Sequence, residues 1–181
     1  MTGRTHIAFN TTILFALTGA GIILSHNPNA GDIAFIGGIM LGGLLPDIDN
    51  PDSKISRKLG RTPSSVDNPY QKFHHRRKFT HWPIFCLVTG MCLYGLTNLY
   101  AHPVFSGFFA GLTVGTLAHL FCDMFNPYGI LLLAPFFRKQ FHIIRIPVGS
   151  IGEIFFLVLS IASIFLVTIA FMMIRYLYQN H

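Results

Sequence analysis

The chain has 181 residues, of which 51% are hydrophobic and only 11% charged, whereas a typical soluble domain has roughly 25% charged residues. A soluble domain of this size has too much surface for its volume to bury so many apolar side chains. The same composition excludes a disordered chain, a coiled coil and a secreted disulfide scaffold. We therefore predict an all-α integral membrane protein with one domain over residues 1–181.

Apolar runs of membrane-spanning length recur along the chain, since a bilayer core needs roughly 20 apolar residues per helix. The four longest runs lie at 7–25, 82–100, 104–125 and 151–174. We expect the first to be a retained span, because no convincing signal-peptide cleavage site follows it. A fifth run at 33–45 is shorter and glycine-rich, which suits a tightly packed helix. Gly107, Gly111 and Gly115 predict a second close helix contact, so we expect a polytopic bundle of about five spans.

The basic residues indicate how the bundle is oriented. Lys and Arg number 13 against seven Asp and Glu, giving a net charge of +6. Eight of the 13 fall in the segment 46–81 and three in 126–150, while the links 26–32 and 101–103 have none. The positive-inside rule then predicts a multi-pass inner-membrane protein whose N-terminus and two long loops are cytoplasmic, with the C-terminus outside. We expect the lipid bilayer, and no nucleic acid, as partner.

Polar residues gather at the helix ends on this predicted cytoplasmic side. They are His6, Asp47, Asp49, His75, His81, His119, Asp123 and Glu153. The charge count and the positions of these residues are independent observations, yet they select the same face. Ionisable residues in membrane helices are costly and mark functional sites by default. The sequence therefore predicts a metal site at the cytoplasmic helix ends.

The spacing of the acids supports such a site. His119 and Asp123 are four residues apart and share one face of a helix. Pro46 is expected to end the span at 33–45 and to leave Asp47 and Asp49 in extended backbone. In that conformation, residues two apart point the same way and can flank a cation.

The histidines at 75 and 81 require a bend between them, because they do not share a helical face. Thr80 is a suitable N-cap and Pro83 falls in the first turn, so His81 is expected at the mouth of the next helix. His75 would then reach in from the loop. His74 is an alternative to His75 as the ligand, since the spacing does not distinguish them.

The basic residues beside these histidines have two interpretations. Arg76 and Arg77 are suited to phosphate oxygens, which arginine binds in bidentate fashion. The alternative is a cluster beside the membrane that contacts anionic lipid headgroups.

These motifs together resemble a family of inner-membrane, metal-dependent hydrolases called YdjM-like. The matching stretches are Thr5-His6, Leu45-Pro46-Asp47-Ile48-Asp49, His75-Arg76 with Thr80-His81, His119-Leu120 with Asp123, Pro127 with Gly129, and Gly149-Ser150 with Glu153. The resemblance runs in the same order over nearly the whole chain. It implies a membrane-bound hydrolase whose metal is held by these histidines and acids.

Eight candidate ligands exceed what one tetrahedral zinc ion needs, so two divalent ions are expected, with zinc first and manganese or iron as alternatives. The leading hypothesis is a phosphoesterase acting on a lipid or polyprenyl phosphate at the cytoplasmic leaflet. His6 and Glu153 are candidate ligands, orienting groups or general bases, and Arg76 and Arg77 are candidate phosphate ligands. One alternative is a metal-dependent lipid ester or amide hydrolase. Another is a protein without catalytic activity that binds metal or transports cations.

Overall fold

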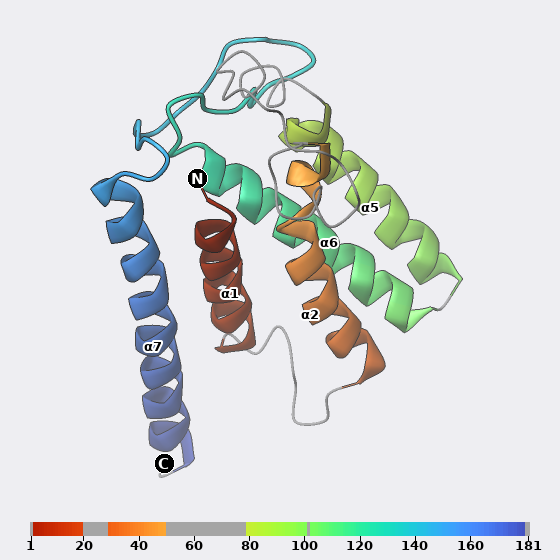
Figure 1. Ribbon diagram of the computed structural model, residues 1–181. Helices are drawn as coiled ribbons and strands as arrows, with labels where there is room; N and C mark the ends of the chain where they lie inside the picture. The colour runs from red at the N-terminus through yellow and green to blue at the C-terminus, as the bar shows by residue number, and fades with distance from the viewer. Residues whose placement is uncertain (1, 20–28, 50–78, 101, 180–181) are drawn as a thin grey trace.

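The computed structural model describes residues 2–19, 29–49, 79–100 and 102–179. The regular elements in these ranges are helices, with no β-strand, as predicted (Figure 1), and 124–150 is an irregular connection with one isolated β-bridge. The α-helices are α1 (Gly3–Gly19), α2 (Ala30–Gly42), α5 (Pro83–Leu99), α6 (Pro103–Asp123) and α7 (Ile151–Gln179). Two short 3₁₀ helices, η1 (Leu45–Asp49) and η2 (Phe79–His81), lie at the ends of the 46–81 segment.

Each α-helix overlaps one of the predicted spans, although the bounds differ by several residues for α1 and α2. Three segments of the described chain are long and apolar enough to cross a membrane, namely Ala30–Asp47, Pro103–Asp123 and Ile151–Ile174. Helix α5 is apolar but shorter, at 17 residues. Large apolar side chains stay exposed along α5 and α7, for example Leu99 (78%) and Ile151 (85%). Such continuous apolar surface is typical of helices that face lipid.

The glycines of α2 and α6 form one shared interface. A Cβ atom on Gly38 or Gly42 would lie within 3.0 Å of the α6 backbone. A Cβ on Gly107, Gly111 or Gly115 would approach the α2 backbone equally closely. The predicted close contacts are therefore confirmed, but the two glycine sets face each other in a single contact and not in two separate ones.

Two local predictions were wrong. Asp47 lies in the 3₁₀ helix η1 and not in extended backbone, and its N–H donates to the Leu44 carbonyl (3.2 Å). Pro46 permits this because its fixed φ suits a first helical turn. Residues two apart in a 3₁₀ helix do not point the same way. Thr80 lies in η2, and Trp82 occupies the N-cap of α5, although Pro83 begins that helix as predicted.

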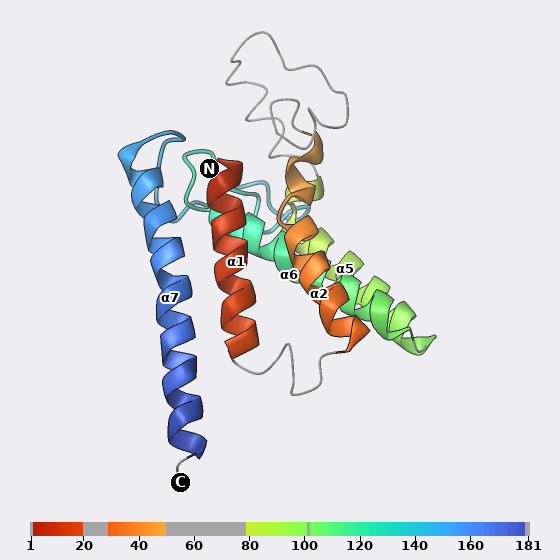
Figure 2. The ribbon, with the colours of Figure 1, turned by 60° about the horizontal axis from the view of Figure 1, so that its bottom comes forward.

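The helices alternate in direction and bring one set of ends together. In Figures 1 and 2, α6 runs between α2 and α5, while α1 and α7 lie side by side. The start of α1, the end of α2, the start of α5, the end of α6 and the start of α7 all lie toward one end of the molecule. This end carries the N-terminus and the 124–150 connection.

Candidate metal centre

Five of the predicted ligands meet at this end of the bundle. Helix α1 contributes His6, η1 contributes Asp47, η2 contributes His81, and the last turns of α6 contribute His119 and Asp123. The three histidines and Asp123 are at most 2% exposed, while the Asp47 side chain is 23% exposed. Four segments that are far apart in sequence thus enclose one polar cluster inside an otherwise apolar bundle.

The separations within the cluster suit ligands of a shared ion. His119 Nε2 lies 3.7 Å from Asp123 Oδ2 and 3.9 Å from Asp47 Oδ1. His81 Nε2 lies 3.8 Å from Asp123 Oδ2. These distances exceed a normal hydrogen bond, but ligand atoms around a tetrahedral zinc ion with bonds of about 2.1 Å are about 3.4 Å apart. Two overlapping groups result, His6 with Asp47 and His119, and His81 with His119 and Asp123.

The hydrogen bonding of His119 determines which nitrogen faces the cluster. Its Nδ1 lies 2.7 Å from the Gly43 carbonyl, which can only accept a hydrogen bond, so Nδ1 carries the proton. Nε2 then presents a lone pair, and it is buried with no hydrogen-bond partner among the described residues. A backbone carbonyl that orients an imidazole in this way is the usual second partner of a metal-bound histidine.

The ring of His6 stacks on that of His119. The ring centroids are 3.9 Å apart and the planes differ by 12°. A ring nitrogen's lone pair lies in the plane of the ring, so two stacked rings cannot both point their lone pairs at one position. Asp123 is placed to serve both rings, because its Oδ1 lies 3.4 Å from His6 Nε2 while its Oδ2 faces His81 and His119. Asp123 therefore lies between His6 on one side and His81 and His119 on the other.

Two buried asparagines lie near the cluster, although neither was predicted as a site residue, and one of them bonds a cluster residue directly. Asn126 Nδ2 donates to Asp123 Oδ1 and so orients that carboxylate. Asn10 is 1% exposed and lies one helical turn after His6, with its Nδ2 3.4 Å from the carbonyls of Ile39 and Gly115. The available sequence signal was a lone amide four residues after His6 within an apolar run.

Glu153 lies outside both groups of candidate ligands. Its carboxylate accepts hydrogen bonds from the Thr2 N–H, from Thr5 Oγ1 (2.8 Å) and from the Gly149 N–H (2.7 Å). These bonds fasten the start of α1, next to His6, to the start of α7. The described contacts of Glu153 therefore position α1 relative to α7. Its role as ligand or base stays a prediction.

The other predicted site residues cannot be placed. His74, His75, Arg76 and Arg77 lie outside the described residues. Asp49 belongs to η1, but its side chain is not part of the described structure. Their roles stay predictions.

The described part of the chain is built from helices, and three of its segments are long and apolar enough to cross a membrane, so this is a helical membrane protein. The chain belongs to the YdjM inner membrane protein family, whose model matches residues 1–180. It is 33% identical over 138 residues to the uncharacterized protein YvsG of Bacillus subtilis (strain 168), covering 75% of this chain and 74% of that protein. It is 30% identical over 98 residues to the inner membrane protein YdjM of Escherichia coli (strain K12), covering 51% of this chain and 44% of that protein. No solved structure matches the chain.

Proposed function

We propose that this protein is a membrane-embedded, metal-dependent hydrolase, a phosphoesterase that acts on a lipid or polyprenyl phosphate at the cytoplasmic leaflet. The observation that carries the proposal is the buried cluster of three histidines around Asp123, with His119 Nε2 free of hydrogen bonds among the described residues. A buried polar atom of this kind costs free energy unless a ligand satisfies it. Divalent metal is the ligand that an imidazole and carboxylate set suits.

Two ions fit the cluster better than one. His6 would bind one ion, and His81 and His119 would bind the other. Asp123 and Asp47 would supply the carboxylate ligands. Zinc is the first choice, and manganese or iron also accept mixed imidazole and carboxylate ligands.

The chain's own residues supply orientation and a dry environment. Bound divalent ions would lower the pKa of water to about 7 and stabilise the charge that develops on the phosphoryl group. Gly43 holds His119 in one tautomer and Asn126 holds Asp123. Arg76 and Arg77 are proposed to bind the phosphate oxygens. His6 and Glu153 are the candidates to move the proton.

The test counts metal and product. The purified protein is loaded with zinc or manganese, bound metal is measured by mass spectrometry, and phosphate release is followed from phosphatidic acid and a polyprenyl phosphate. His119→Ala is expected to lower activity by more than about 100-fold, because losing even an outer partner of a ligand costs about 10–100-fold. His102→Ala, before the opposite end of α6, is the matched control and should retain both metal and activity.

The outcomes separate the alternatives. Absence of bound metal in the wild-type protein, or full activity in His119→Ala, would overturn the proposal. Release of fatty acid without phosphate would instead identify a metal-dependent lipid ester hydrolase, and Arg76→Ala should then have little effect.

A further inference from the structure

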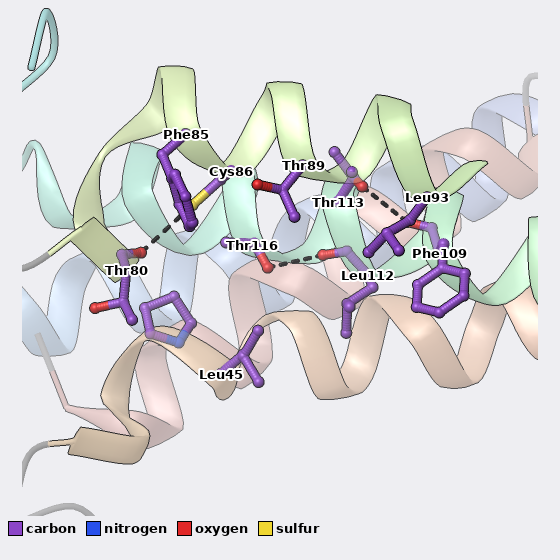
Figure 3. A pocket seen from close by; sticks show the side chains of 12 residues that line it. Leu45, Thr80, Phe85, Cys86, Thr89, Leu93, Phe109, Leu112, Thr113 and Thr116 are labelled. Carbon is purple, nitrogen blue, oxygen red and sulfur yellow. Dashed lines mark hydrogen bonds between the residues drawn. The ribbon is translucent and has the colours of Figure 1, made fainter. Parts of the chain in front are cut away.

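An apolar groove opens beside the metal centre, between α5 and α6 (Figure 3). Its cavity has a volume of about 160 Å³. Leu45 and Thr80 line it at one end, and Leu93 and Phe109 line it toward the other. The groove is therefore a channel along the two helices and not a pit at the helix ends.

Most polar side chains that line the groove make hydrogen bonds within the protein, and among them Thr89 is the one for which none is seen. Thr113 Oγ1 donates to the Phe109 carbonyl (2.7 Å), and Thr116 Oγ1 donates to the Leu112 carbonyl (2.8 Å). Cys86 Sγ lies 3.4 Å from the Thr80 carbonyl. The hydroxyl protons of Thr113 and Thr116 are thus already donated to carbonyls of α6. A ligand held here would be recognised by its apolar surface.

One end of the groove adjoins the metal centre. Leu45 comes two residues before Asp47, Thr80 directly precedes His81, and Thr116 lies one helical turn before His119. Thr80 Oγ1 also lies 3.1 Å from His81 Nδ1, so groove and centre share a wall. From Phe85 to Leu93 the groove extends about 12 Å along α5, at 1.5 Å per residue. One leaflet of hydrocarbon is about 15 Å deep.

We propose that this groove holds one acyl chain of a membrane lipid whose phosphate lies at the metal centre. The inference rests on the proposed function and narrows its substrate class. An apolar cavity of about 150 Å³ is large enough to bind a benzene ring, so 160 Å³ accommodates a segment of straight chain. The length of the groove matches the part of a chain that lies in one leaflet. A polyprenyl chain, branched at every fourth carbon and far longer than a leaflet is deep, fits it poorly.

Binding can be tested without relying on catalysis. The probe is phosphatidic acid with a photoreactive diazirine in the middle of one acyl chain, in vesicles of phosphatidylethanolamine and phosphatidylglycerol. We expect labelled peptides from 83–93 and 109–116 to exceed those from the lipid-exposed helix α7. Thr89→Phe, which fills the groove, should lower groove labelling about tenfold (about 1.4 kcal/mol), the effect of displacing roughly two methylene groups. Val88→Phe adds the same ring to the neighbouring exposed position, outside the groove lining, and should change nothing.

A second variant tests the length of the groove. Leu93→Trp blocks its far end and should slow hydrolysis of a 16-carbon phosphatidic acid while sparing an 8-carbon one. Groove labelling no stronger than that of α7, equal loss in Val88→Phe, or displacement of the probe by a polyprenyl phosphate would each overturn the inference. Hydrolysis without groove labelling would contradict the groove proposal and leave the proposed function standing. Groove labelling without hydrolysis would contradict the proposed function and leave lipid binding in the groove standing.

Discussion

Asp123 faces different histidines with its two oxygens, Oδ1 toward His6 and Oδ2 toward His81 and His119. If both oxygens bind metal, Asp123→Asn should lower the stoichiometry from about two ions to one or fewer, because an amide nitrogen is no ligand. Metal analysis of the loaded protein measures this directly. The control is Asp32→Asn, in the capping box at the opposite end of α2. The amide oxygen of the new side chain can still accept the hydrogen bond from the Asn29 N–H. An unchanged ion count in Asp123→Asn would contradict the bridging arrangement.

A substitution of Glu153, the chain's single glutamate, can show whether this residue only positions α1 and α7 or also binds metal. Its carboxylate accepts from two backbone N–H groups and the Thr5 hydroxyl. Glu153→Gln places an amide NH₂ among these donors and should destabilise the fold by about 1–3 kcal/mol. Metal bound at saturation should be unchanged, since Glu153 lies outside both ligand groups. Thermal unfolding and metal titration on the same sample check both expectations, and loss of one ion at saturation would show that Glu153 is a ligand.

Individual site residues were predictable where a short sequence interval fixes their geometry. The spacing of four placed His119 and Asp123 together, because an α-helix brings i and i+4 to one face. Asn10 could not be found this way. Its partners are the carbonyls of Ile39 and Gly115, which are distant in sequence and approach only when α1, α2 and α6 pack. An amide whose partners are backbone atoms leaves no pattern in the sequence.

The contact between α2 and α6 depends on glycine, and it sets the position of the candidate ligands that follow α2 and end α6. Gly111→Ala would place a methyl group against the Phe35 carbonyl of α2. Backbone cannot rotate away as a side chain can, so the variant should lose about 1–3 kcal/mol of stability. Gly95→Ala in α5 is the matched control, because nothing lies within 4 Å of its Cβ, and alanine favours a helix by about 0.5–1 kcal/mol. Thermal unfolding in detergent should therefore rank Gly95→Ala at or above wild type and Gly111→Ala clearly below. Equal melting temperatures would show that the interface can separate without cost.

Element boundaries were predicted less well than the elements themselves. The first apolar run suggested a start at residue 7, whereas α1 begins at Gly3 and includes His6. Hydropathy locates the apolar part of the helix, whereas the polar residues Thr5 and His6 in the first turn of α1 are buried in the protein. The same reasoning explains Asp47, where Pro46 was read as a helix stop although it also suits the start of a 3₁₀ turn.

At the scale of the whole molecule, the ligands occupy a single end because successive helices alternate in direction. His6 lies near the start of α1, Asp47 follows α2, His81 precedes α5, and His119 lies near the end of α6. The sequence predicted this convergence from charge counting and from the helix ends. It could not predict which ligands touch, because the stacking of His6 on His119 depends on how α1 packs against α6.

The alternation also makes the membrane orientation testable. In sequence, the basic segment 46–81 connects η1 to η2 and the basic segment 126–150 connects α6 to α7, whereas the turn between α5 and α6 has no Lys or Arg. The positive-inside rule then predicts that the proposed metal centre faces the cytoplasm. In a background without the three native cysteines, an impermeant maleimide should label His102→Cys in intact cells. It should label Val148→Cys, an exposed position near the start of α7, only in inverted vesicles. Metal content serves as the check that each variant is folded. The reverse labelling pattern would show that the proposed centre and its lipid substrate are at the outer leaflet.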